Sequence, residues 1–310
     1  MSHNTLYLLL TSILVGILLG ILGATAAHYF RTGIYFIEQF IESNFETTNN
    51  FIIIFCSLSV AACLITLIKI RFGVTNWQGP ADTIFAAHRV DNELDIKTGV
   101  ASTLAAFLSA AGGASVGQYG PLVHFGATLG SWIKAILKLR ISTDIILGGG
   151  VAAAISAGFN APLAGIIFAH EAILRHFSLK ALAPIALASG TAFLIHNYLW
   201  DASTPLIGLY SGIEVGPMIL LTILAGPFFG LVAILFMFTL ITFSKLPRKI
   251  GLNQFQSILI AIIGLSSIGT FYPEVMGLGT STIVNLTTGN TLLFAATTIL
   301  VAKIIATALS

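Results

Sequence analysis

The stretch GQYGPLVHFGATLG, residues 117–130, places four glycines and a proline inside an apolar run. Glycine and proline both destabilise the interior of a soluble helix. Proline is favoured, however, at the first helical position, where its missing N–H costs nothing. The sequence therefore predicts a helix that opens at Pro121, with Gly120 as its cap and with free backbone N–H groups from Gly120 to Val123.

Free N–H groups and the positive end of a helix dipole attract anions, and glycine lets an ion approach the backbone closely. The stretch contains no lysine or arginine, which favours an ion that leaves again quickly, as conduction requires. The alternative is a glycine-rich surface for helix packing. The predicted anion site consists of Gly117, Gln118, Tyr119, Gly120, Pro121, Leu122 and Val123.

The composition predicts an integral membrane protein made of helices. Of the 310 residues, 56% are hydrophobic and 8% are charged, whereas a soluble domain carries roughly 25% charged residues. The net charge of +2 is too small to indicate a nucleic-acid partner. Several apolar segments are too short to span a bilayer alone, which is typical of the broken or re-entrant helices of transporters. The segments are 5–30, 52–70, 99–116, 121–139, 145–158, 162–176, 178–199, 214–243, 253–270 and 292–309.

The first apolar segment resembles a signal peptide, but no lysine or arginine precedes it and it is longer than a typical signal core, so we expect a retained membrane helix. Gly16 and Gly20 form a small-xxx-small pair, which predicts close packing against another helix. Glu38, Glu42 and Glu46 follow this helix, and basic residues end several later segments. The positive-inside rule then puts the N-terminus on the cytoplasmic side. The expected location is the cell (inner) membrane.

Two other stretches share the same pattern. GFNAPLAGIIFAHE (158–171) has Pro162 opening an apolar helix, and TNWQGPADTIF (75–85) has Gly79 and Pro80 before another. Three such starts in one chain strengthen the case for broken helices with a functional role, beside the alternative of simple packing.

These blocks resemble a known family. GQYGPLVHFGATLG is similar to the G-[KR]-E-G-P-x-V-x-x-G motif of the CLC chloride channels and chloride/proton antiporters, and GFNAPLAGIIFAHE to that family's next block, FNAPLAG-I-x-F-x-x-E-E. QGPAD lies where the family has G-S-G-I-P-E, and residues 272–290 and 292–310 resemble the stretch before its G-x-F-x-P motif.

The resemblance covers nearly the whole chain and implies two inverted repeats, with helix N-termini converging on an ion near the middle of the bilayer. It also implies a homodimer with one pore in each subunit. Residues 1–202 correspond to the first repeat and residues 211–310 to the second. The second repeat is expected to be incomplete, because the G-x-F-x-P block and a later tyrosine of the family have no counterpart before Ser310.

The family's gating glutamate falls on Tyr119, according to the same resemblance. A carboxylate there can occupy the anion position and carry a proton. A phenol with a pKa near ~10 stays neutral; it donates a hydrogen bond to an anion but neither competes as an anion nor carries protons. The family's paired glutamates fall on Glu171 and Ala172, so the usual internal proton acceptor is an alanine.

The serine of the family's G-S-G-I-P falls on Trp77 if the prolines are aligned, and Gln78 offers a donor amide instead. The resemblance therefore implies a possible inner anion site at Trp77, Gln78 and Gly79. Glu171 and His124 are candidates for a proton path, because ionisable residues inside a membrane are functional hypotheses by default. The alternatives are a packing role for His124 and an i,i+4 ion pair between Glu171 and Arg175.

Together these features predict passive transport of small anions, with chloride as the first candidate. The alternatives are a chloride/proton antiporter with relocated proton groups and a truncated membrane scaffold that does not transport. The expected partners are the anion, the lipid bilayer and a second copy of the chain. The sequence contains no Ser/His/Asp arrangement, metal-ligand cluster or nucleotide loop, so we expect no enzyme, no metal and no cofactor.

Overall fold

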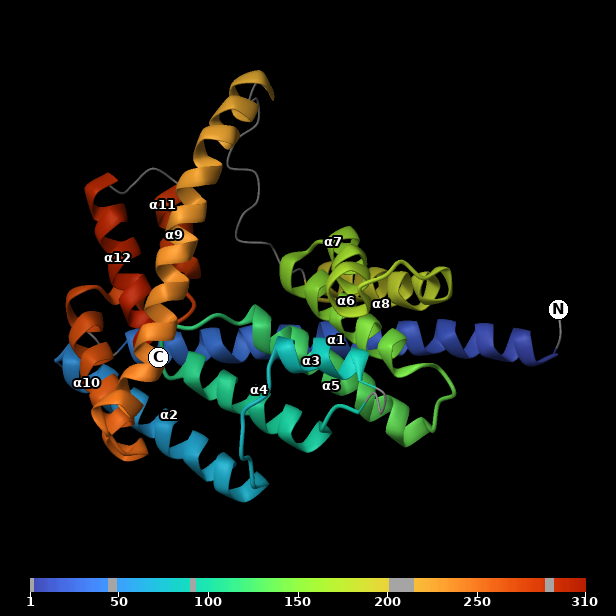
Figure 1. The fold of residues 1–310 in the computed structure, drawn as a ribbon, viewed down its shortest axis with the longest axis horizontal. Coiled ribbons are helices and arrows are strands. Elements are labelled where there is room, and N and C mark those ends of the chain that lie inside the picture. The colour runs from blue at the N-terminus through green and yellow to red at the C-terminus, as the bar shows by residue number, and fades with distance from the viewer. Residues whose placement is uncertain (1–2, 44–48, 90–92, 201–214, 288–292) are drawn as a thin grey trace. The chain divides into compact units, whose positions relative to one another are not determined.

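The computed structural model describes residues 3–43, 49–89, 93–200, 215–287 and 293–310, and every regular element in these ranges is a helix (Figure 1). This confirms the predicted all-α class. The elements are α1 (His3–Glu42), α2 (Asn50–Phe72), α3 (Pro80–His88), α4 (Ile96–Ala111), α5 (Tyr119–Leu137), α6 (Thr143–Phe159), α7 (Pro162–Phe168), the π-helix η1 (Ala169–Leu174), α8 (Leu179–Tyr198), α9 (Val215–Ile250), α10 (Gln254–Phe271), the 3-10 helix η2 (Pro273–Val275), α11 (Thr280–Thr287) and α12 (Leu293–Leu309).

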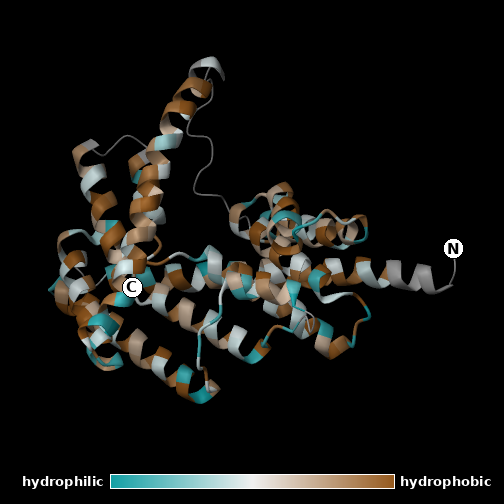
Figure 2. Ribbon diagram, in the orientation of Figure 1, coloured by the Kyte–Doolittle hydropathy of each residue, from teal (hydrophilic) through white to brown (hydrophobic). Residues whose placement is uncertain are grey.

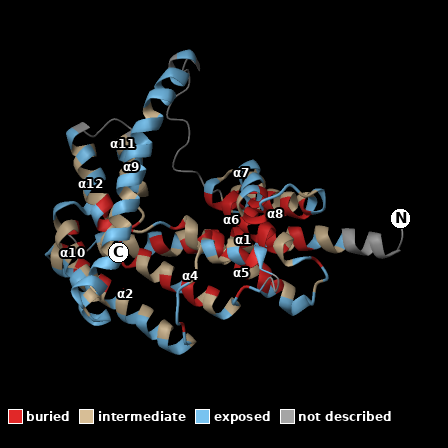
Figure 3. Cartoon of the chain, in the orientation of Figure 1, coloured by how far each residue is buried: buried red, intermediate tan, exposed pale blue. Residues whose placement is uncertain are grey.

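Within the described residues, five helices are long and apolar enough to cross a membrane. They are α1, α2, α8, α9 and α10. The apolar side chains of α9 stay exposed along the helix (Figures 2 and 3), an arrangement that suits hydrocarbon, where the helix satisfies its own backbone. Other apolar helices, such as α4 and α6, are shorter than the ~20 residues that span a bilayer, as the sequence predicts.

The chain forms two compact units, of which the first contains residues 1–37, 63–111 and 117–204. Its centre is α6, whose sequence GGGVAAAISAG is buried on all sides. Alanine and glycine leave no side-chain bulk, so neighbouring helices approach the α6 backbone directly. The helices α5, α7 and α8 and the π-helix η1 all pack on it, and the red of Figure 3 gathers there.

The crossing of α5 and α6 depends on two facing glycines. A Cβ atom at Gly126 would lie 2.3 Å from the carbonyl oxygen of Gly150, and a Cβ at Gly150 would lie 2.1 Å from that of Gly126. No side chain fits at such distances, so backbone touches backbone at this point. The crossing therefore brings α5 and α6 closer together than any side-chain contact allows.

The predicted small-residue pair on α1 is confirmed. A Cβ at Gly16 would lie 2.6 Å from the carbonyl oxygen of Pro184, and one at Gly20 would lie 2.6 Å from that of Ala188. Both partners belong to α8, which thus packs on α1 through backbone contacts one helical turn apart.

The second unit contains residues 38–62, 112–116 and 205–310. Its apolar cluster joins Ile54 and Leu58 of α2 to residues of α10, η2 and α12. A side chain of α12 binds the end of η2 and the loop after it: Lys303 Nζ donates hydrogen bonds to the carbonyl oxygens of Val275 (2.9 Å) and Gly277 (3.0 Å).

Several boundaries differ from the sequence prediction: α4 ends at Ala111 and not at 116, α9 continues to Ile250 and not only to 243, and α1 and α5 differ as well. The helix α1 continues to Glu42, so Glu38 and Glu42 lie on this helix and not in a loop after it; Glu46 lies outside the described residues. Apolar Ile34, Ile37 and Ile41 keep a helical spacing through this segment, which explains the extension. The helix α5 begins at Tyr119, two residues before the predicted start at Pro121.

Candidate functional site

The start of α5 presents backbone N–H groups that have no hydrogen-bond acceptor among the described residues. Gln118 is the N-cap residue, and the N–H groups of Tyr119 and Gly120 donate to no described residue. The first turn of α5 contains no acidic residue, so no side chain of this turn offsets the positive end of its dipole. Leu122 N–H already donates to the carbonyl oxygen of Gln118 (3.2 Å), so of the predicted range Gly120 to Val123 we retain Gly120, and Tyr119 joins it from outside that range.

Tyr119 lies at this opening, where its ring contacts a neighbouring ring. Its ring stacks on that of Phe159, with centroids 3.9 Å apart and an angle of 20° between the planes. Its hydroxyl group hydrogen-bonds to none of the described residues. The phenol is therefore held at its ring and has an unused donor, which is the chemistry that recognises an anion.

Buried polar atoms without partners accompany the free N–H groups. Gln118 is 4% exposed, and its Oε1 atom has no hydrogen-bond partner among the described residues. The same holds for Gln78 Oε1, which lies just before α3. The starts of α3 and α5 adjoin, because a Cβ at Gly120 would lie 3.6 Å from Cγ of Pro80. The two helix starts thus share a polar region.

The start of α3, the predicted inner anion site, is internally satisfied. Gly79 N–H donates to the Asp82 carboxylate (2.8 Å) and Gln78 N–H to Ser102 Oγ (2.9 Å). The carboxylate of Asp82 in the first turn offsets the positive end of the α3 dipole. Trp77 is exposed. Two of the backbone donors that such a site needs are therefore engaged within the protein.

His124 joins the two helices. It is 1% exposed, and its Nδ1 atom lies 2.9 Å from Oγ1 of Thr83 on α3, while its Nε2 atom has no described partner. This hydrogen bond matches the packing role that the sequence allows. The orphaned Nε2 shows that the ring also retains an unused polar group.

Glu171, the other candidate for a proton path, is exposed and lies on the π-helix η1. Arg175 ends this segment in the left-handed conformation (φ 56°). No ion pair joins these two described residues, so the i,i+4 pair suggested by the sequence does not form. The wider turn of a π-helix removes the i,i+4 register on which such a pair depends.

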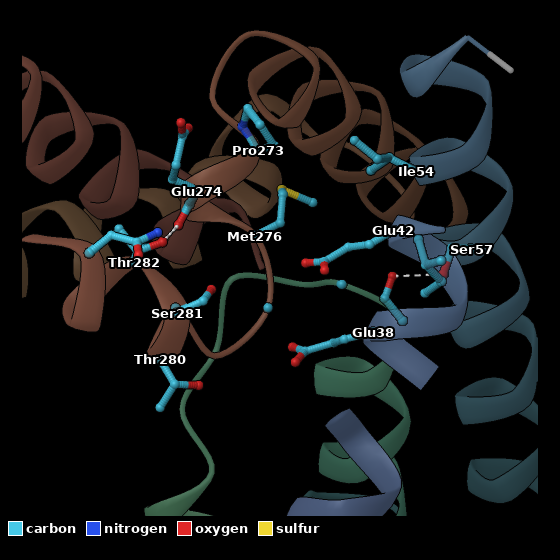
Figure 4. A pocket seen from close by; sticks show the side chains of 16 residues that line it. Glu38, Glu42, Ile54, Ser57, Pro273, Glu274, Met276, Thr280, Ser281 and Thr282 are labelled. Carbon is cyan, nitrogen blue, oxygen red and sulfur yellow. Dashed lines mark hydrogen bonds between the residues drawn. The ribbon is translucent and has the colours of Figure 1, made fainter. Parts of the chain in front are cut away.

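A separate cavity of about 340 Å³ lies within the second unit. Figure 4 shows the carboxylates of Glu38 and Glu42 directed into the same space, beside Ser57, whose hydroxyl donates to the carbonyl oxygen of Gly112 (2.9 Å). Glu38 also accepts the N–H of Leu278 (3.2 Å). Two carboxylates repel anions, so the cavity does not have the chemistry of the α5 start.

The sequence prediction missed Phe159. The residue belongs to the motif-like block at 158–171, but its partner Tyr119 lies forty positions earlier, and no spacing rule connects them. The glycine before it is the available signal, because Gly158 leaves room for a neighbouring ring: a Cβ there would lie 3.3 Å from Cδ1 of Tyr119.

A family model described as voltage gated chloride channel matches residues 61–310 of the chain. The H(+)/Cl(-) exchange transporter ClcA of Klebsiella pneumoniae is 31% identical over 189 residues, which are 57% of this chain and 39% of that protein. This chain spans about a quarter to two fifths of the length of the curated relatives that it matches.

Solved structures show the same fold. A CLC-type fluoride/proton antiporter superposes with a TM-score of 0.79 at 22% identity, over 100% of this chain and 77% of that one. A slow cyanobacterial Cl-/H+ antiporter superposes with a TM-score of 0.78 at 18% identity, over 97% of this chain and 73% of that one. With a family model that matches most of its length and this shared fold, the chain belongs to the voltage-gated chloride channel (CLC) family and is a multi-pass integral membrane protein.

Proposed function

We propose that this protein carries small anions passively across a membrane, with chloride as the first candidate. The anion is held at the start of α5, within the segment Gly117–Val123. Its proposed donors are the N–H groups of Tyr119 and Gly120 and the Tyr119 hydroxyl. The observation that carries the proposal is the open start of α5, which lacks an acidic residue and whose first N–H groups meet no described acceptor. Backbone amides and a phenol discriminate weakly among small anions.

The passive mechanism rests on two residue types. Tyr119 and Ala172 stand where the resemblance places the family's two proton-carrying glutamates, and neither residue has a carboxylate. A free anion can therefore cross without a compensating proton.

A second candidate is chloride/proton exchange. It is favoured by the relative named as an exchange transporter and by the unused Nε2 atom of buried His124. In this version His124 and Glu171 together form the proton path. A non-transporting scaffold is the third candidate.

The proposed assembly is a homodimer with one pore per subunit in a cell (inner) membrane, with the N-terminus in the cytoplasm. Within each subunit, residues 1–202 form the first repeat and residues 211–310 belong to the second. The loop Trp77–Gly79 contributes at most weakly to the anion path, since Asp82 and Ser102 already accept two of its N–H groups.

Simultaneous flux measurements test the three candidates. Liposomes containing the protein are loaded with chloride, and chloride efflux and internal pH are followed together. We expect chloride efflux without uphill proton movement. Proton uptake driven by the chloride gradient would replace the passive mechanism with exchange, and the absence of chloride efflux would favour the scaffold.

The Tyr119 hydroxyl is tested by Tyr119→Phe, which keeps the stacked ring and removes the donor. A net hydrogen bond of ~0.5–1.5 kcal/mol predicts about a two- to tenfold loss of chloride flux. Tyr198→Phe is the matched control, because Tyr198 is exposed on α8 and should leave the flux unchanged. Equal flux in both variants would remove the hydroxyl from the site.

A further inference from the structure

We propose that Phe159 is a positioning residue that holds the Tyr119 ring as a stationary stop at the anion site. The proposal rests on the function proposed above for Tyr119. The two rings stack nearly parallel with centroids 3.9 Å apart, which is closer than the 4.5–7 Å typical of aromatic pairs. Tyr119 and Phe159 come from different helices, α5 and α6, so the stack joins the helix that offers the N–H groups to a neighbour.

Burial does not keep Phe159 in place, since 49% of the residue is exposed. The backbone of α6 does so instead. Gly158 leaves its surface clear, so that the Tyr119 ring lies against the end of α6, 3.3 Å from where a Cβ would stand. Any other residue at position 158 would push against this ring.

The end of α6 is itself tied to α8. Asn160 takes the left-handed conformation (φ 55°) that closes the helix, and its N–H donates to the carbonyl oxygen of Ser156. Asn197 Nδ2 donates to Asn160 Oδ1 (2.6 Å) and to the carbonyl oxygen of Phe193 (2.9 Å). The chain of contacts from Asn197 through Asn160 to Phe159 thus sets the position of the platform under Tyr119.

A stacked ring and a free ring differ in what they do to an anion path. A free tyrosine side chain samples several staggered rotamers, and each rotamer moves its hydroxyl. The stacked ring keeps one rotamer, so both the donor and the width of the path stay constant. Removing the platform should therefore mobilise Tyr119 and relax the discrimination between small and large anions.

The first test observes the ring without relying on transport. 3-Fluorotyrosine is placed at position 119 of the full chain, and its ¹⁹F NMR signal is recorded in detergent. Phe159→Ala should shift and narrow this signal, and Phe159→Trp should keep it broad. Phe177→Ala is the matched control, because Phe177 is exposed and contacts His170 instead. An unchanged signal in Phe159→Ala, or the same change in the control, would overturn the proposal.

The second test is a double-mutant cycle on anion flux in liposomes. Phe159→Ala should raise thiocyanate flux relative to chloride flux by about two- to tenfold, the equivalent of the ~0.5–1.5 kcal/mol of an aromatic pair. The same substitution in a Tyr119→Ala background should have no further effect. If Phe159→Ala fails to fold, Phe159→Leu takes its place, because leucine keeps apolar volume but cannot stack. Phe159→Leu should then show the same rise in thiocyanate flux relative to chloride flux.

The outcomes separate the two proposals. Equal effects of Phe159→Ala with and without Tyr119 would show that Phe159 acts on its own, which would overturn the positioning role. Absence of chloride flux in the unmodified protein would refute the proposed function, and the NMR comparison would still decide whether Phe159 holds the ring.

Discussion

The starts of α3 and α5 differ chemically although both begin with glycine and proline. In α3, Asp82 lies three residues after the cap Gly79 and accepts its N–H, so the first turn is closed by the protein itself. In α5, Pro121 occupies the position that corresponds to Asp82, and it has neither a carboxylate nor an N–H. One residue at the third helical position therefore separates a self-capped helix from one that is open to an external anion.

The largest expected effect comes from placing a carboxylate in the open start. In Tyr119→Glu the new side chain competes with the anion while it is ionised. Chloride flux should fall at least about tenfold at pH 7 and recover as the pH falls through the glutamate pKa, near ~4.3 or below beside a helix N-terminus. Flux in liposomes from about pH 7.5 down to about pH 3, which brackets this pKa, measures the recovery.

Tyr119→Gln is the neutral control for that variant. It should show no recovery in acid. If the flux of Tyr119→Glu is independent of pH, Tyr119 lies outside the anion path and the open start of α5 is not the site.

The second expected effect copies the α3 cap into α5. Pro121→Asp places a carboxylate where it can accept the N–H of Gln118, as Asp82 does for Gly79. Chloride binding, measured by isothermal titration, should weaken about five- to tenfold because the carboxylate repels the anion. Pro121→Asn has similar size without the charge and should weaken it much less. Equal losses in both variants would trace the effect to the lost proline.

The third expected effect is the reverse exchange. Asp82→Asn removes the negative charge from the start of α3 and weakens the acceptor for Gly79 N–H. A dipole contribution of ~0.3–1 kcal/mol predicts about a two- to fivefold gain in chloride affinity. Ser102→Ala, which frees Gln78 N–H without changing the charge, provides a comparison. A lower affinity in Asp82→Asn would mean that Asp82 supports the site and does not compete with it.

The smallest expected effect concerns the cap of a third helix, α4. Asp95 accepts the hydroxyl of Thr98 and the N–H groups of Lys97 (3.0 Å) and Thr98 (3.3 Å). The Thr98 hydroxyl, helped by these N–H groups, lowers the pKa of Asp95 below its usual value of 3.8. Asp95→Asn should lower the free energy of unfolding by ~0.5–1 kcal/mol at pH 7 without changing anion affinity.

The sign of the pH dependence follows from the lowered pKa. The stabilisation by Asp95 is fully present above its unfolded-state pKa of ~3.9 and is lost as the pH falls through its folded-state value. The stability difference between Asp95→Asn and the unmodified protein, from thermal melts in detergent, should therefore shrink below pH 4. A difference that does not shrink at all as the pH falls below ~4 would contradict the capping role.

Local rules predicted most of the helices and the three proline-containing helix starts, that of α5 to within two residues, because glycine and proline act through their own backbone. The same rules contain the capping of α3, since an acid three residues after a cap is a known signal, and Asp82 stands there in the sequence. The platform under Tyr119 could not be predicted, because it depends on where the end of α6 meets the start of α5. The continuation of α1 to Glu42 could not be predicted, because Glu38 and Glu42 are charged and suggest a loop. The N–H of Leu278, which Glu38 accepts, lies far away in the sequence.

The glycine contact between α5 and α6 provides a point about which the two helices can rotate. Gly126 and Gly150 form this pivot, and the Tyr119–Phe159 pair lies away from it, at the start of α5 and the end of α6. At a rise of 1.5 Å per residue, each ring is about 10–14 Å from the pivot, so a rotation of about 5° there separates the rings by about 1 Å. Because backbone touches backbone at the pivot, the helices can rotate about it but can hardly slide. A modest change in their crossing angle would be enough to open or close the stack.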